Sequence, residues 1–331
     1  MSRRRQKRNQ ALWAEQPGLF DLPADDTASG ATELTPMADE AFVRPERMRF
    51  LSFGSGSSGN CSYIGTPNCG LLIDAGVDNK YVMAQLEANS IDVKTIQGIL
   101  LTHDHSDHVR YAYAILRYNR HMRLYATPKA FNGLLRRHSM SRRIADYHSP
   151  IFKEFPFTVG PMTVTAFETS HDGSDNCGFC IEGPGATFVV TTDTGTITAR
   201  ADFYMRKASY LMIESDYDEH MLRTGPYPQH LKARIASTVG HMDNADTGRY
   251  IASIAGAGDL RRVFLCHLSD HNNTPLIALN TVRSIIEEAG IPVCHDAEPL
   301  PNEKRLHISA LPRQKSSALV LMDSAILKDE L

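Results

Sequence analysis

The sequence has few of the features that mark secreted or membrane-spanning proteins. Its 331 residues include only six cysteines, scattered along the chain and not clustered as in a small disulfide scaffold. No run approaches the roughly 18 uninterrupted apolar residues of a membrane helix, and no apolar segment follows the basic N-terminus. With 42% hydrophobic and 22% charged residues, the composition is that of an ordinary globular chain. We therefore expect a cytoplasmic protein with reduced thiols and no membrane partner.

The first part of the chain lacks an apolar period and separates its charges. Residues 1–10 carry five Arg or Lys and no acid, whereas residues 11–43 carry seven acids and no Arg or Lys. We interpret residues 1–46 as a disordered N-terminal extension, 47–312 as the folded catalytic domain and 313–331 as a C-terminal tail. The pattern of the tail leaves open whether it is a docked element or a loose end.

The folded part alternates hairpins with strand–helix units. Three short β-prone runs at 48–56, 61–65 and 69–76 are separated by turn residues, which predicts an antiparallel start. Hairpins are expected across 151–168 and 177–193, and helices near 78–90, 107–119, 129–138, 229–239, 244–256 and 275–289. This mixture predicts an α/β (α+β) fold in which two packed mixed sheets carry helices on their outer faces.

The most informative string follows an apolar strand expected to begin at residue 96. It holds three histidines and two aspartates within six residues: His103, Asp104, His105, Asp107 and His108. Burying so many polar groups without a partner would be costly. Sites in α/β sheets lie beyond the carboxyl ends of strands, where this loop falls. The HxHxDH spacing therefore indicates metal binding in preference to a solvated loop.

Four further polar residues stand at the ends of predicted strands. Asp74 closes CGLLI, His171 follows TVTAFETS, Asp193 ends ATFVVTT, and His267 ends RVFLC. A single Asp or His in such a place more often caps a turn. Four of them, in this order around HxHxDH, favour one shared site.

Together these residues resemble the five ordered motifs of the metallo-β-lactamase fold, which implies a single αββα sandwich over residues 47–312. The resemblance implies one divalent ion held by His103, His105 and His171, and a second held by Asp107, His108 and His267. Asp193 would bridge the two ions. Asp74 would orient a ligand histidine through a hydrogen bond.

Longer strings resemble the YycJ/WalJ (VicX) branch of that fold. They are FGSGSSGNCSYIG, LLIDAG, TSHD, GFCIEG, TTDTG, ESDYDEHMLRTGPYPQHLKARI, GHMDN and CHLSDHNNTP. The resemblance implies a 5′-to-3′ DNA exonuclease acting in DNA repair or processing. The chain departs from the branch at Tyr217, where a histidine is expected, and in its long N-terminal extension.

A pair of divalent ions suits phosphodiester hydrolysis. Two ions about 4 Å apart can acidify a shared water, whose bridging hydroxide attacks in line, and can stabilise the attacking and leaving oxygens. Histidine and carboxylate ligands fit Zn²⁺, Mn²⁺ or Fe²⁺ about equally. We expect two ions, Mn or Zn, and the resemblance favours Mn²⁺. Catalytic roles are expected for Asp107, Asp74 and His241, the last as a proton donor or phosphate contact, although it could simply bond to backbone.

Several residues are candidates for binding the substrate. Residues 109–145 carry nine Arg or Lys, starting with Arg110, and no Asp or Glu before 146, with five aromatic residues interleaved. Beside a dimetal centre, this favours a surface for nucleic acid over a merely solvated face. Ser57, Ser58 and Asn60 form a polar turn that can offer N–H groups to phosphate, or be only a hairpin turn. Asn272 can shape the same rim or help to cap the last helix.

Two short motifs need separate treatment. Cys177 and Cys180 lie three apart in a predicted strand and so face opposite sides, with no second thiol pair, which favours core cysteines over a metal or redox site. Gln16–Phe20, reading QPGLF, resembles the Gln-x-x-Leu-Phe core of peptides that dock on bacterial sliding clamps. It could instead anchor the extension to its own domain.

Three other functions remain open on the sequence. An RNA nuclease and a hydrolase of small cyclic phosphodiesters share the chemistry, but the 22 and 74 steps from His171 to Asp193 and from Asp193 to His267 leave no room for a large inserted substrate domain. The third is a non-catalytic, metal-binding regulatory module. Keeping all seven candidate ligands argues against it, because an uncompensated charged cluster is costly.

Overall fold

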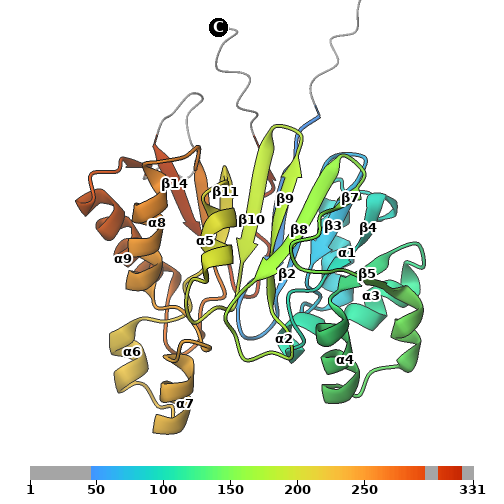
Figure 1. Ribbon diagram of the computed structural model, residues 1–331, viewed down its shortest axis with the longest axis horizontal. Coiled ribbons are helices and arrows are strands. Elements are labelled where there is room, and N and C mark those ends of the chain that lie inside the picture. Colours follow the sequence, from blue (N-terminus) through green and yellow to red (C-terminus); the bar gives the residue numbers. More distant parts are fainter. Residues whose placement is uncertain (1–45, 295–304, 323–331) are drawn as a thin grey trace, which may run out of the picture. The chain divides into compact units, whose positions relative to one another are not determined.

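The computed structural model describes residues 46–294 and 305–322. Within them, two mixed sheets pack face to face and helices cover their outer faces, as the sequence predicts (Figure 1). The proposed clamp peptide Gln16–Phe20 lies outside the described residues. None of the described helices combines the length and hydropathy that a bilayer span requires.

The loop with the HxHxDH string follows a strand of the first sheet. In the described residues its strand order is β15 (Val320–Leu321), β1 (Arg49–Gly54), β2 (Cys61–Gly65), β3 (Gly70–Ile73), β4 (Ile96–Leu100), β5 (Arg123–Ala126) and β6 (His148–Pro150). β1 to β3 pair antiparallel, which confirms the predicted start, and β3 to β6 pair parallel. Because β15 pairs with β1, this part of the C-terminal segment is a docked element.

The second sheet has a similar mixture. Its order in the described residues is β13 (Val293–Cys294), β14 (Leu306–Ala310), β12 (Arg262–Cys266), β11 (Tyr210–Glu214), β10 (Ala186–Thr191), β9 (Cys177–Gly183), β8 (Met162–Glu168) and β7 (Phe157–Val159). β7 to β10 are antiparallel, and β10, β11, β12 and β14 are parallel. The predicted hairpin across 177–193 is confirmed, and Gly185 supplies the positive φ of 75° that its turn requires.

The described helices flank the two sheets. They are α1 (Asn79–Ala88), α2 (Ser106–Val109), α3 (Ala112–Tyr118), α4 (Pro128–Arg137), α5 (Ala199–Met205), α6 (Glu219–Thr224), α7 (Gln229–Ile235), α8 (Asn244–Ala255) and α9 (Pro275–Glu288). Side chains of α1, α3 and α4 pack on the outer face of the first sheet, and those of α5, α8 and α9 on that of the second. Between the sheets, the ring of Phe50 lies 5.0 Å from Phe188 and 4.6 Å from Phe264.

The single helix predicted over 107–119 is wrong, because the chain forms two helices there. The loops after two other strands take the backbone groups that a continuous helix would use: the N–H of Tyr111 donates to the carbonyl of Ala75, after β3, and the carbonyl of Asp107 accepts from the N–H of Asn60, after β1. The helix therefore breaks between residues 109 and 112. The break turns the HxHxDH loop back against β3, where it meets Asp74.

The cysteines lie where the strand pattern predicts. Cys177 packs between the sheets, whereas Cys180 lies on the outer face of the second sheet. All six cysteines are buried. Burial raises the pKa of the Cys180 thiol to about 12, so it is a protonated core residue.

Candidate metal centre

Strand ends bring the candidate residues to one edge of the sandwich. Asp74 follows β3, the HxHxDH loop follows β4, Asp193 follows β10, and His267 follows β12. Three of these residues adopt left-handed backbone conformations, with φ of 61° at Asp74, 47° at Asp193 and 53° at His267. Such conformations cost about 1–3 kcal/mol each in non-glycine residues and cluster at functional sites. The strain marks this edge as the functional one.

Asp193 lies at the centre of the cluster. One oxygen, Oδ2, lies 3.4 Å from Nε2 of His108 and 3.5 Å from that of His267. The same oxygen is 3.7 Å from Nε2 of His103 and of His171. The donor atoms of the seven candidates form two groups, each within 4.8 Å, that share Asp193: one with His103, His105 and His171, the other with Asp107, His108 and His267. A third group of the same size combines Asp193 and His267 with Glu214 and His241. The structure thus brings together all seven residues expected to hold metal.

Fixed partners aim three imidazole rings into this cluster. Nδ1 of His108 donates to Asp74 Oδ2 at 2.7 Å, and Nδ1 of His171 donates to a backbone carbonyl, that of residue 240, at 2.9 Å. Nδ1 of His267 faces the carboxylate of Glu214 at 3.0 Å. Each contact leaves Nε2 directed inward. Hydrogen bonds to the outer nitrogen are the usual means of orienting a histidine that binds a metal.

These residues fit divalent cations. Nε2 of His103 is buried without a hydrogen-bond partner among the described residues, which is costly unless it coordinates an ion. Burial, followed by the neighbouring histidines, lowers the pKa of His103 well below its ordinary value, so the ring is neutral as coordination requires. The donor set contains only imidazole nitrogen and carboxylate oxygen, which suits Zn²⁺, Mn²⁺ or Fe²⁺.

Asn60 contacts the cluster from the turn after β1. Its buried side-chain amide donates to Asp107 Oδ2 at 3.2 Å and lies 3.0 Å from Nε2 of His108. The side-chain oxygen accepts the backbone N–H of Gly56 at 2.9 Å. The side chain of Asn60 therefore positions Asp107, a role that the sequence analysis did not predict. Binding of phosphate by the turn stays a prediction.

His241 lies beside the metal cluster and is bound to Glu214. Its Nδ1 donates to Glu214 Oε1 at 2.7 Å, and its ring stacks on His267 with centroids 5.0 Å apart. Burial by itself would lower the pKa of His241, but the carboxylates of Glu214 and Asp216 raise it to about 9. The side chain keeps 17% of its surface exposed. It is thus a cationic group with access to whatever binds at the cluster.

The other candidate substrate residues differ in exposure. Ser57 and Ser58 are exposed at the turn, and the guanidinium of exposed Arg110 donates to the Ser58 carbonyl at 3.2 Å. Asn272 is fully buried, and its amide donates to Ser269 Oγ at 3.3 Å. Tyr217, where the sequence departs from its branch, is buried in the small apolar cluster under α6 and α7.

Two functional residues were missed by the sequence analysis. Glu214 is fully buried at the end of β11 and contacts both His241 and His267. Its position at a strand end, like that of Asp193, is a signal that could have found it. Asp104 accepts from the backbone N–H and the hydroxyl of Ser174 at 2.8 and 2.7 Å, so it ties the HxHxDH loop to the loop after His171. The HxHxDH motif leaves the position of Asp104 unspecified, so the spacing gives no signal for it.

Known proteins share both the sequence and the fold. Residues 70–268 match the family model of the beta-lactamase superfamily domain. The chain is similar to exodeoxyribonuclease YycJ of Bacillus anthracis, with 31% identity over 263 residues covering 76% of this chain and 96% of the relative. It is 29% identical over 246 residues to exodeoxyribonuclease WalJ of Streptococcus pneumoniae serotype 2, covering 74% and 90%.

Solved structures with similar folds are more distant in sequence. The metallo-beta-lactamase fold protein YhfI from Bacillus subtilis has a TM-score of 0.57 at 15% identity, covering 83% of this chain and 99% of that one. Zn²⁺-bound PqqB from Methylobacterium extorquens has a TM-score of 0.53 at 20% identity, covering 76% and 99%. At these identities the similarity shows the fold alone.

Proposed function

The chain belongs to the YycJ/WalJ family of the beta-lactamase superfamily and is a metal-dependent hydrolase, and we propose that it is an exodeoxyribonuclease that degrades DNA from the 5′ end. The single observation that carries this proposal is the buried cluster around Asp193, with cationic His241 at its margin. Two relatives covered over 90% or more of their length are named exodeoxyribonucleases, which supports DNA as the substrate.

In this proposal the two donor groups hold two divalent ions, with Asp193 shared between them. Bound ions would supply positive charge and Lewis acidity at the scissile phosphate. The donors suit both Mn²⁺ and Zn²⁺. Mn²⁺ is the favoured ion because of the resemblance to the exonuclease branch, and Zn²⁺ is the alternative. Asp74 fixes His108, Glu214 fixes His267, and Asn60 fixes Asp107, so the protein holds the donors in place before substrate arrives.

His241 is the proposed proton donor to the leaving oxygen. Its pKa of about 9 keeps it protonated at neutral pH, and its partial exposure lets it reach a bound phosphodiester. Glu214 supports this role in two ways. Its charge holds the proton on His241, and its second oxygen accepts the backbone N–H groups of Thr194 and Met242 at 2.8 and 3.2 Å, which fixes the carboxylate.

A substrate panel tests the proposal. Metal-stripped protein is resupplied with Mn²⁺ or Zn²⁺ and given double-stranded DNA, single-stranded DNA, RNA and a small phosphodiester ester. The proposal predicts hydrolysis of DNA well above that of RNA and the ester. Preference for RNA would establish the RNA nuclease instead, and hydrolysis of the ester alone would establish a hydrolase of small phosphodiesters.

A role in DNA repair, a cytoplasmic location and docking on a sliding clamp through Gln16–Phe20 stay predictions. The clamp prediction has a simple test, which is the binding of a peptide of residues 11–24 to a bacterial clamp beside a clamp-binding control peptide. Binding of the control alone would overturn it.

A further inference from the structure

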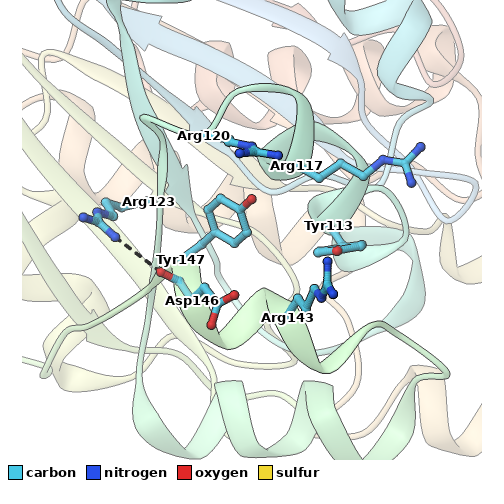
Figure 2. Close-up of a pocket in the computed structure, with 7 residues that line it drawn as sticks. All are labelled: Tyr113, Arg117, Arg120, Arg123, Arg143, Asp146 and Tyr147. Carbon is cyan, nitrogen blue, oxygen red and sulfur yellow. Dashed lines mark hydrogen bonds between the residues drawn. The ribbon is translucent and has the colours of Figure 1, made fainter.

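A basic pocket, separate from the metal cluster, lies on the flank of the first sheet. A cavity of about 430 Å³ is lined by four arginines, Arg117, Arg120, Arg123 and Arg143, and by two tyrosines, Tyr113 and Tyr147. We name it the arginine pocket. Figure 2 shows its lining side chains, which come from α3, the turn after α3, the start of β5 and the 3-10 segment Arg142–Tyr147.

Helical spacing explains how one face of α3 contributes to this pocket. Tyr113 and Arg117 are four residues apart and so share one face of α3, whereas Arg120 lies in the turn after this helix, which ends at Tyr118. Arg123 opens β5, and its guanidinium donates to the backbone carbonyl of Asp146 at 3.4 Å. Arg117 donates to the hydroxyl of Tyr118 at 2.6 Å. Both acceptors are neutral, so neither hydrogen bond offsets the charge of its guanidinium group.

Arginines outnumber carboxylates four to one in the lining of this pocket. No ion pair within 4.0 Å joins any of its four guanidinium groups to a carboxylate in the described ranges, although the carboxylate of Asp146 also lines the cavity. Elsewhere, Arg206 pairs with Asp202 at 2.9 Å. Several unpaired guanidinium groups around one space repel one another and favour an anion, and guanidinium groups match phosphate oxygens in pairs.

The pocket and the metal cluster lie toward opposite ends of the same strands. Arg123 pairs with Gly98 of β4, and the metal-binding loop starts five residues later, at His103. At about 3.3 Å per residue, this separation is roughly 16 Å along the strand. Along the axis of a DNA duplex one strand advances about 3.4 Å per nucleotide, so the separation corresponds to at most about five nucleotides. Arg110, which contacts the turn at Ser58, lies between the two sites in the sequence.

We propose that the arginine pocket binds an internal phosphate of the substrate strand, at most about five nucleotides from the scissile bond. Tyr113 and Tyr147 then contact the adjoining sugar or base. The inference rests on the proposed function, because it takes a polynucleotide as the substrate. It makes a specific prediction: affinity for substrate increases once the strand is long enough to reach the pocket.

The first test measures kinetics against substrate length. Arg120→Ala/Arg143→Ala is the informative variant, because both side chains are exposed and no contact of their guanidinium groups within the described part holds the fold. Arg206→Ala is the control: it removes an exposed arginine just after α5, outside the pocket. With 5′-phosphorylated strands of 3 and 12 nucleotides, the double variant should raise KM for the 12-mer about tenfold, leaving kcat and the 3-mer unchanged. Equal effects on both lengths, or none, would overturn the pocket.

The second test separates the pocket from catalysis. Binding of a fluorescent 12-mer is measured in the His103→Ala/Asp107→Ala background, which cannot hold the metals, over a range of salt concentrations. Loss of one phosphate contact on a single strand should reduce the slope of log Kd against log salt by roughly 0.7. If the wild-type protein digests no DNA in the substrate panel and the arginine substitutions still reduce this slope, the proposed exonuclease activity fails but the pocket stands. Digestion with an unchanged slope overturns the pocket alone.

Discussion

Replacing Glu214 with Gln should change the pH dependence of hydrolysis while keeping the volume of the side chain. Glu214 Oε1 lies 2.7 Å from Nδ1 of His241 and 3.0 Å from Nδ1 of His267. Its carboxylate is the main charge that holds a proton on the buried His241. In Glu214→Gln that charge is gone, and burial favours the neutral imidazole.

The size of the effect follows from the pKa of His241. The protein raises it from 6.5 to about 9, which at ~1.4 kcal/mol per pKa unit corresponds to ~3 kcal/mol. A proton donor is active while protonated, so activity is present below this pKa and lost as the pH rises through it. If the variant returns the pKa to 6.5, protonation at pH 8 falls from roughly 90% to roughly 3%. We expect about a 30-fold loss of kcat/KM at pH 8 and little loss at pH 6.

The assay is a profile of kcat/KM against pH for wild type and Glu214→Gln, each with its metal content measured. The alkaline limb should move to lower pH in the variant. If both proteins hold equal metal and their alkaline limbs coincide, His241 is not the proton donor and the reasoning fails. Loss of metal alone would lower the whole profile without moving its limb.

Three further substitutions test how the site is built. Asp74→Asn should reduce metal affinity about 10- to 100-fold, because it removes the charge beside an oriented histidine, while asparagine tolerates the left-handed backbone there. Gly76→Ala should abolish activity and lower Tm, because a Cβ would lie only 1.5 Å from the carbonyl oxygen of Asp107. Cys177→Ala/Cys180→Ala should leave metal content unchanged, since the two thiols lie on opposite faces of β9.

Each of these has a clear contrary result. Metal titration that gives Asp74→Asn the wild-type affinity would remove its orienting role. The control for Gly76 is Gly256→Ala, where a Cβ meets nothing within 4 Å, and equal thermal unfolding of the two variants would contradict the steric argument. Loss of metal from the folded double cysteine variant would show that the thiols contribute to the site.

The sequence was most informative where strand ends meet. Asp74, Asp193 and His267 each close an apolar run, and parallel strands carry such ends to one edge, so the gathering of the donors could be predicted. The opposite faces of Cys177 and Cys180 followed from the strand period.

Long-range contacts account for what could not be predicted. The break before α3 depends on backbone hydrogen bonds to the loops after β1 and β3, which no local period encodes. Glu214 has only its place at a strand end as a signal, and its contacts with His241 and His267 become visible once β11 is placed beside β10 and β12. The arginine pocket joins residues of three elements, so the side to which the basic stretch faces becomes visible only when α3, β5 and the 3-10 segment are assembled.

The most direct test of the central claim compares 5′-labelled and 3′-labelled DNA in a time course with Mn²⁺, using wild type and His103→Ala/Asp107→Ala. The account predicts immediate release of short labelled products from the 5′ end, stepwise shortening of the 3′-labelled strand, and neither in the variant at equal folded content. Equal degradation by the variant would show that the cluster around Asp193 is not the catalytic centre. Release from the 3′ end first would contradict the proposed polarity.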